Sequence, residues 1–202
     1  MAADREGQAA PEVLFLVEEY KNIAATHDKL RDLLGRLFNY FLLLSAFPFT
    51  VAGIIFRDGG FNFASAPVSL HLLFIVVGVG HLFLALTLVD ARLGQYRYAR
   101  TVNAIRKYFL DHAPSLAPYL YLPVDSNVPS WEDLGYIGYQ VHFMYGSGAA
   151  YTAYGAGAAA AHFGSISMGI AASVVTAIGY LAAYTTLRKQ ILGRYQKHKG
   201  IK

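Results

Sequence analysis

The chain of 202 residues contains no cysteine, which excludes disulfide bonds, thiol catalysis and metal sites built on cysteine. Charge is also scarce: 15% of the residues are charged, against about 25% in an average globular protein. No charged residue occurs in the 54 positions between Asp133 and Arg188, a longer run than a water-soluble domain of this size needs. These absences indicate an integral membrane protein.

Three charge-free runs are long enough to cross a bilayer, since a helix needs about 20 apolar residues to span about 30 Å of hydrocarbon. The run after Asp133 has room for two crossings. The sequence therefore predicts an all-α integral membrane protein with four transmembrane helices. Their expected positions are about Leu37 to Phe56, Ala66 to Val89, Tyr136 to Ala161 and Met168 to Leu187.

The distribution of basic residues predicts the orientation in the membrane. Sixteen of the 17 Lys and Arg residues lie before the first span, between the two hairpins or after the last span, and Arg57 alone lies in the first hairpin loop. Cytoplasmic segments carry the excess of Lys and Arg, so both termini and the central segment are expected in the cytoplasm. The first span is expected to act as the targeting signal. The net charge of +4 is then explained mostly by this excess of cytoplasmic Lys and Arg and by favourable contact with anionic lipid.

Five segments follow from this layout. They are a cytoplasmic amphipathic helix over 1–36, a first transmembrane hairpin over 37–89, a cytoplasmic basic helix with a Pro-rich connector over 90–134, a second transmembrane hairpin over 135–187, and a basic cytoplasmic tail over 188–202.

The N-terminal segment carries an unbroken heptad stripe that begins at Val13 and runs into the first span at Leu37. One helix is therefore expected to continue from the cytoplasm into the membrane as an extension of span one. The stripe must bury against the protein's own central segment or against further copies of the chain, and the pattern fits both equally. For self-association the expected contact residues are Leu16, Tyr20, Ile23, His27, Leu30 and Leu34.

The central helix, about Asp90 to Asp111, extends span two and has a basic face. Such a face is more often solvated or laid against lipid headgroups, and there is no Gly-rich phosphate loop to favour a nucleotide. The alternative is an anionic, nucleotide-like or oligonucleotide ligand. Its expected contacts are Arg97, Arg100, Asn103 and Lys107.

The third span is rich in glycine, alanine and hydroxyl groups, which favour close helix packing and are unusual on a face that meets lipid. It is the expected central helix, either packed or lining a pore. The residues expected at the pore or packing face are Tyr145, Gly148, Tyr151, Tyr154 and Gly155. Pro48 in span one predicts a kink, read either as a packing feature or as a gating hinge.

No Asp, Glu, Lys or Arg lies within a span, so the proton relays and buried ion pairs of active transporters are not expected. Paired histidines on neighbouring spans could ligate haem or metal. Depth argues against it. His71 and His162 both fall toward the outside, but His162 lies almost in the loop, and His81 and His142 both fall toward the inside but differ by several residues in expected depth. We expect no cofactor, no metal and no catalytic residue, although an enzyme acting through acids at the inner surface stays open.

The run YRYARTVNAIRKYF, followed by the Pro-rich LAPYLYLP, and the overall layout resemble the small multi-pass membrane effectors of bacterial antiphage operons, including CBASS-like systems. The resemblance covers the whole chain in outline. It implies a bacterial inner membrane protein that forms a homo-oligomeric channel or pore when a cytoplasmic signal arrives. Two other classes remain open: a redox (haem) or lipid-modifying membrane enzyme, and a membrane scaffold that binds a partner protein through its cytoplasmic helices.

Overall fold

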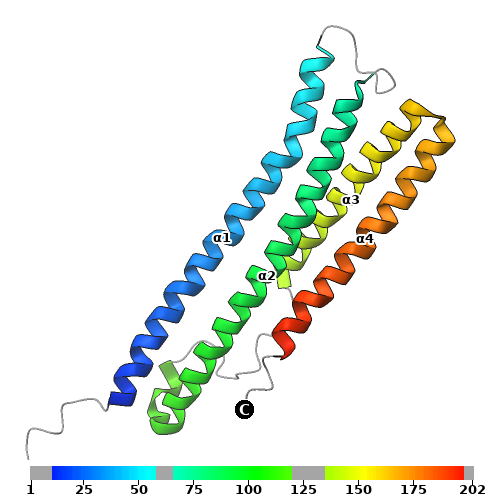
Figure 1. Cartoon of the computed structure of the whole chain (residues 1–202). Coiled ribbons are helices and arrows are strands. Elements are labelled where there is room, and N and C mark those ends of the chain that lie inside the picture. Colours follow the sequence, from blue (N-terminus) through cyan, green and yellow to red (C-terminus); the bar gives the residue numbers. More distant parts are fainter. Residues whose placement is uncertain (1–10, 58–65, 120–134, 198–202) are drawn as a thin grey trace, which may run out of the picture. The chain divides into compact units, whose positions relative to one another are not determined.

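Four long helices make up most of the protein in the computed structural model, which describes residues 11–57, 66–119 and 135–197 (Figure 1). They are α1 (Pro11–Ile55), α2 (Val68–His112), α3 (Gly135–Phe163) and α4 (Ile166–Lys197), with a short 3-10 helix, η2 (Pro114–Tyr119), after α2. The described residues contain no strand, so the predicted all-α class is confirmed. Most of the Pro-rich connector lies outside the described residues.

The helices α1 and α2 are each 45 residues long and continuous. At 1.5 Å per residue each measures about 68 Å, roughly twice the thickness of the hydrocarbon layer. The heptad stripe and the first span thus belong to one helix, and the basic helix is a direct continuation of span two. The second of these helices ends at His112 because Pro114 cannot continue the hydrogen-bonded ladder.

Three of the helices are long and apolar enough to cross a membrane: α1 over Val13–Ile55, α2 over Val68–His112 and α4 over Ile166–Tyr195. By length and composition these three helices match the predicted spans. The helix α3 is not among them. Its place as a fourth span remains a prediction.

The chain divides into two compact units. The described part of unit 1 comprises residues 11–33 and 93–119, and that of unit 2 comprises residues 34–57, 66–92 and 135–197. In unit 1 the heptad stripe packs against the chain's own α2. Ile23 and Ile105 are both buried there, and the Arg106 guanidinium donates a hydrogen bond of 3.1 Å to the Tyr20 hydroxyl. Of the two partners expected for the stripe, the chain's own central segment and further copies of the chain, the structure shows the first.

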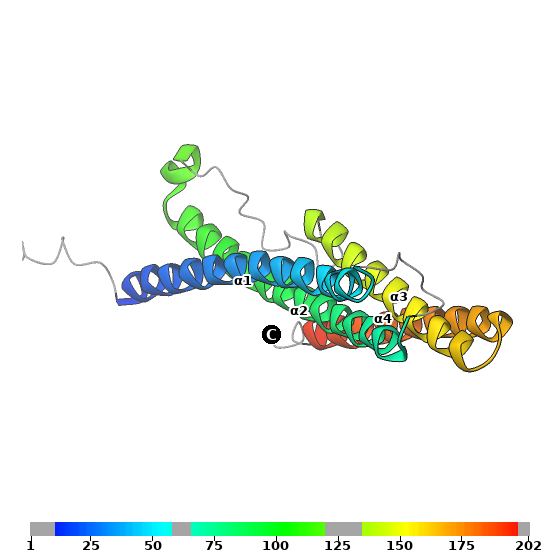
Figure 2. The ribbon, with the colours of Figure 1, turned by 90° about the horizontal axis from the view of Figure 1, so that it is seen from above.

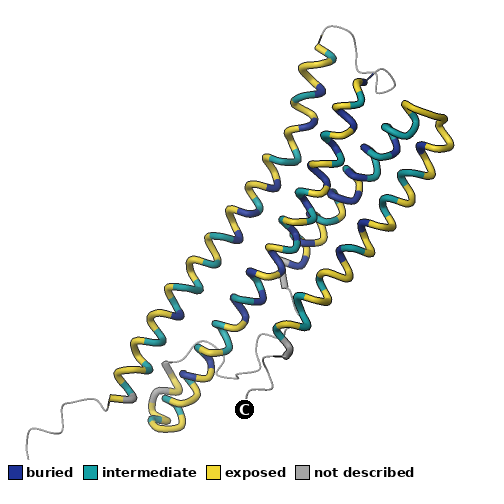
Figure 3. The backbone as a smooth tube through the Cα atoms, in the orientation of Figure 1, coloured by how far each residue is buried: buried dark blue, intermediate teal, exposed yellow. Residues whose placement is uncertain are grey.

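In unit 2 the helices differ in burial, as Figure 3 shows. Of the most apolar 18-residue stretch, 44% is buried in α2, against 17% in α1 and 11% in α4. The helices α3 and α4 turn back on each other after Phe163 and lie side by side (Figures 1 and 2). Glycine permits this approach: a Cβ on Gly157 would lie 2.8 Å from the Gly169 carbonyl oxygen of α4.

The most constrained helix is α3. Between Gly138 and Ala161 its exposed residues form a single narrow stripe, and every other side of the helix is partly or fully covered. The stripe consists of Tyr139, His142, Phe143, Gly146 and Ala150. Its glycine and alanine content thus serves packing on several sides at once.

Candidate functional site

A cluster of polar groups lies among the apolar side chains of unit 2, centred on His81 of α2. The His81 side chain is fully buried. Its Nε2 lies 3.1 Å from the hydroxyl of Ser45 on α1, and its Nδ1 lies 3.5 Å from the hydroxyl of Ser147 on α3. A neutral imidazole has one donor and one acceptor nitrogen, and hydroxyl groups can satisfy either. Three helices therefore meet at one histidine.

Tyr151 of α3 completes this His81 cluster of Ser45, His81, Ser147 and Tyr151. Its hydroxyl donates a hydrogen bond of 2.7 Å to the Ser45 backbone carbonyl, and its ring centroid lies 5.1 Å from that of His81. Ser45 is thus held twice, through its side chain and through its backbone. Both contacts tie α1 to the other two helices.

Pro48, the expected hinge, is fully buried and lies three residues after Ser45 on α1. Proline has no amide hydrogen, so the Leu44 carbonyl lacks its usual partner within the helix. The neighbouring carbonyl, that of Ser45, is the one that receives the Tyr151 hydroxyl. The weakest turn of α1 and its polar attachment to α3 are therefore adjacent.

A cavity of about 340 Å³ lies beside the cluster, lined by Phe49, Phe74, Ala150, Tyr151 and Tyr154. Three helices contribute to it, and its lining is aromatic and apolar. Phe74 packs edge-on against Tyr154 with ring centroids 4.8 Å apart. The cavity provides space into which aromatic side chains can move if the helices shift.

Two glycines bring α2 and α3 into backbone contact. A Cβ on Gly78 would lie 2.7 Å from the Gly148 carbonyl oxygen, and a Cβ on Gly148 would lie 2.8 Å from the His81 Cβ. Tyr180 of α4 reaches the same point, where its hydroxyl donates a hydrogen bond of 2.9 Å to the Gly78 carbonyl. We call Gly78, Gly148 and Tyr180 the three-helix junction.

The remaining residues expected at the pore or packing face contact other helices of the same chain. Tyr145 stacks on Tyr184 of α4 with ring centroids 4.2 Å apart and planes 10° apart. Gly155 faces the backbone of α2, where a Cβ would lie 2.9 Å from the Ile75 nitrogen. Together with Tyr151 and Tyr154, these residues pack against other helices of the same chain in the described structure.

The residues expected to bind an anionic ligand do not share one exposed face in unit 1. Arg97 and Lys107 are exposed and Arg100 is half-buried. Asn103 is buried, and both it and Arg100 already interact with other groups. Of the four, Arg97 and Lys107 are therefore the most accessible to a ligand.

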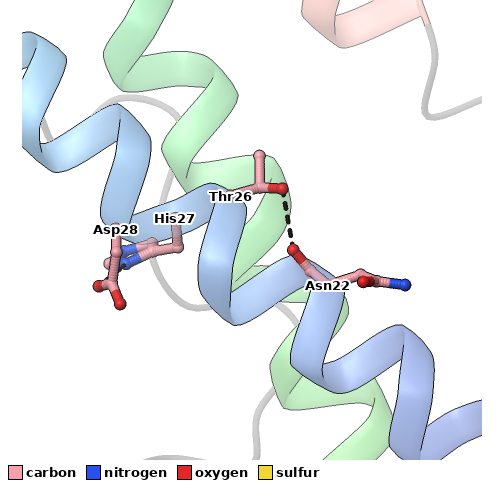
Figure 4. Close-up of polar contacts among 4 residues, drawn as sticks. All are labelled: Asn22, Thr26, His27 and Asp28. Atoms are coloured by element: carbon pink, nitrogen blue, oxygen red, sulfur yellow. Dashed lines mark hydrogen bonds and ion pairs between the residues drawn. The ribbon is translucent and has the colours of Figure 1, made fainter.

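The heptad residue His27 is partly exposed rather than enclosed. Its Nδ1 lies 3.9 Å from the Asp28 carboxylate, whose side chain is 80% exposed. Close by, the Thr26 hydroxyl donates a hydrogen bond of 2.8 Å to the Asn22 carbonyl within the same helix (Figure 4). These are surface contacts of a solvated helix face, of the kind that contribute little to stability.

His162 lies next to the loop, as expected, but this does not keep it away from His71. The helix α3 continues through His162 to Phe163, and the His162 ring centroid lies 6.4 Å from that of His71 on α2. His142 is different, because its Nδ1 contacts the Gly138 carbonyl of its own helix. One of the two histidine pairings considered from sequence is therefore present in space.

Sequence reasoning missed Ser45, Ser147 and Tyr180, since an isolated hydroxyl within a span carries no signal of what it contacts. No carboxylate takes part in the His81 cluster. Among the described residues, no three His, Asp or Glu side chains are grouped as metal ligands. The cluster can hold the helices together, and its hydroxyl and imidazole groups can form hydrogen bonds with water or coordinate an ion.

No protein-family model, curated protein or solved structure matches this chain. Its function is therefore inferred from the geometry of the clusters themselves.

Proposed function

We propose that the protein is a homo-oligomeric membrane channel or pore-forming effector in which α1 moves about Pro48. The observation that carries this proposal is the His81 cluster, which attaches α1 to α2 and α3 through Ser45. Polar and ionisable side chains within membrane spans are costly and are usually retained for function. Here they are placed where one helix can be released from two others.

The opening movement separates Ser45 from His81 and Tyr151. Each hydrogen bond of this kind within a membrane contributes about 0.6 kcal/mol on average, so breaking a few is compatible with reversible gating. Once α1 has moved, the polar groups of His81, Ser147 and Tyr151 face the space that it leaves. Those groups, together with backbone carbonyls, would line the path of the ion.

In this proposal α3 is the fourth span. It has 29 residues, about 44 Å of helix, and it carries no Asp, Glu, Lys or Arg. An even number of crossings returns the C-terminus to the side of the N-terminus. That topology agrees with the distribution of basic residues, because the segments rich in Lys and Arg then share the cytoplasmic side.

Assembly of several copies involves the outward faces of α1 and α4. These faces carry large exposed apolar side chains, such as Leu43 (69% exposed) and Ile54 (71%) on α1 and Val175 (69%) on α4. They meet lipid or a neighbouring copy. The tyrosines of α3 contribute to the path only after α1 moves, since in the described structure they contact their own chain.

Gating by a cytoplasmic anionic ligand involves Arg97 and Lys107, which are exposed on the helix that also carries His81. The role in bacterial antiphage defence rests on the resemblance of the central sequence run and of the layout.

The hinge is tested by ion efflux from vesicles that contain the purified protein. Pro48→Ala restores the amide that bonds the Leu44 carbonyl and stiffens α1, so we expect efflux to fall about tenfold, equivalent to about 1.4 kcal/mol in the opening equilibrium. Pro11→Ala, at the first exposed residue of the same helix, is the matched control and should leave efflux unchanged. Equal efflux from Pro48→Ala and the wild type would contradict the hinge role of Pro48. If no variant releases ions from the vesicles, the channel function itself is contradicted.

A further inference from the structure

His71 is an exception among the histidines of α2 and α3. Its side chain is 2% exposed, and its Nδ1 has no hydrogen-bond partner among the described residues. By contrast, both ring nitrogens of His81 have hydroxyl groups within 3.5 Å, and the Nδ1 of His142 contacts a carbonyl. A buried polar atom without a partner costs about 1–3 kcal/mol, and an ion or water that satisfies it is a common explanation.

The nearest histidine supplies the second half of a site. The His162 ring centroid lies 6.4 Å from that of His71, with the ring planes 62° apart. Two imidazoles bound to one ion at about 2.0–2.1 Å place their ring centroids about 5–6 Å apart. The two rings thus lie near the separation at which one ion binds both, and the exposed His162 side chain can change its rotamer to meet the ion.

The backbone around His71 is held firmly enough to define the position of its ring. Gly155 of α3 lies directly against this turn of α2, where a Cβ would be 2.8 Å from the Ile75 side chain. The Tyr154 ring covers His71 from a second side, with centroids 6.3 Å apart. One ligand is thus fixed in a packed core, and the other is free to adjust at the end of α3.

We propose that His71 and His162 together bind one transition-metal ion, Cu²⁺ most tightly and Zn²⁺ less so. Imidazole nitrogens suit both ions, and Cu²⁺ forms the stronger complex with a given set of nitrogen ligands. Because His162 is exposed, the ion can enter from solvent and water fills its remaining positions. With two protein ligands the site exchanges its ion readily, and it does not depend on whether the protein conducts ions.

The test is titration of the detergent-solubilised full-length protein, purified without a histidine tag, with Cu²⁺ followed by electron paramagnetic resonance. We expect one Cu²⁺ per chain with hyperfine coupling to two imidazole nitrogens. His162→Ala should weaken binding at least about tenfold, and His71→Asn should do the same while preserving a polar side chain of similar size. His142→Ala, which removes an exposed histidine of the same helix, is the matched control and should leave the affinity unchanged.

The proposal is overturned if His162→Ala binds Cu²⁺ as the wild type does, or if His142→Ala weakens binding as much as His162→Ala. A spectrum with fewer than two imidazole nitrogens overturns it as well. The decisive variant is His162→Ala, because an exposed side chain can be truncated without loss of packing. A failure of His71→Asn to fold therefore leaves the outcome unaffected.

Discussion

Tyr180 of α4 donates its hydroxyl hydrogen bond to the backbone carbonyl of Gly78 on α2, over a distance of 2.9 Å. The bond is buried and passes over Gly148 of α3, where a side chain would block it. This hydrogen bond is possible because α2, α3 and α4 approach each other closely at this point. Its contribution to the free energy of unfolding can be measured independently of function.

Tyr180→Phe removes this hydroxyl and leaves the Gly78 carbonyl without its tyrosine partner. We expect a loss of about 1 kcal/mol in the free energy of unfolding, within the range seen for hydrogen bonds between membrane helices. The measurement is equilibrium unfolding in mixed micelles followed by circular dichroism. Tyr139→Phe, at a side chain that is 78% exposed, is the control and should change the free energy little. If both substitutions change the free energy of unfolding equally, the Tyr180 hydrogen bond does not stabilise the three-helix junction.

Gly148 and Gly146 lie two positions apart on α3, but only the substitution of Gly148 by alanine should lower the free energy of unfolding. A Cβ at Gly148 would lie 2.8 Å from the His81 Cβ, whereas nothing lies within 4 Å of a Cβ at Gly146. Overpacking of this kind costs about 1–3 kcal/mol. In the same unfolding experiment Gly148→Ala should be destabilised by this amount and Gly146→Ala should not. Combining Gly148→Ala with Tyr180→Phe removes the nearest clash, with the Tyr180 hydroxyl, and should restore only part of the stability, because the His81 Cβ and the ring carbon of residue 180 would still lie 2.8 Å away.

The absence of native cysteine allows topology to be read from single introduced cysteines. Four spans place Ser165 on the outer side and Asp28 and Lys189 on the inner side, and all three positions are exposed. An impermeant thiol reagent applied to intact cells should label Ser165→Cys and spare Asp28→Cys and Lys189→Cys until the cells are opened. Labelling of Lys189→Cys in intact cells would show that α3 does not cross, because three crossings move the C-terminus to the outside.

Ile23 tests which surface covers the heptad stripe. Its side chain is 5% exposed within a single chain, so Ile23→Ala should destabilise unit 1 by about 2 kcal/mol or more. The expected signal is faster amide hydrogen exchange in residues 11–33 without a change in the number of subunits. Leu14→Ala, at a 59% exposed position of the same helix, is the control. Dissociation of an oligomer by Ile23→Ala would instead assign the stripe to contacts between copies.

Helix positions were predictable from sequence because charge-free runs and a 3.5-residue period both follow from local chemistry. The unbroken stripe through Leu37 predicts a single helix that continues into the first charge-free run, and α1 is continuous over both. The small residues of the third span predict a tightly covered helix, and Gly148 and Gly155 do lie against α2.

Contacts between helices were not predictable, since sequence does not give the register of one helix against another. Ser45 and Tyr151 are 106 positions apart, and nothing in the sequence around either residue indicates that they form a hydrogen bond. The pairing of His71 with His162 was considered from sequence and rejected, for a related reason. His162 does lie next to the loop at the end of α3, but its distance from His71 depends on how α2 and α3 pack, which the sequence does not give.

The central claim is that the His81 cluster holds a channel closed by fixing α1, and a planar-bilayer recording of Tyr151→Phe tests it most directly. This substitution removes the hydrogen bond to the Ser45 carbonyl while keeping the ring, and Tyr40→Phe, at a 56% exposed side chain of α1, is the control. The account predicts discrete conductance events whose open probability is higher for Tyr151→Phe than for the wild type and for Tyr40→Phe. An absence of discrete events in all three proteins, or the same open probability in each, would contradict it.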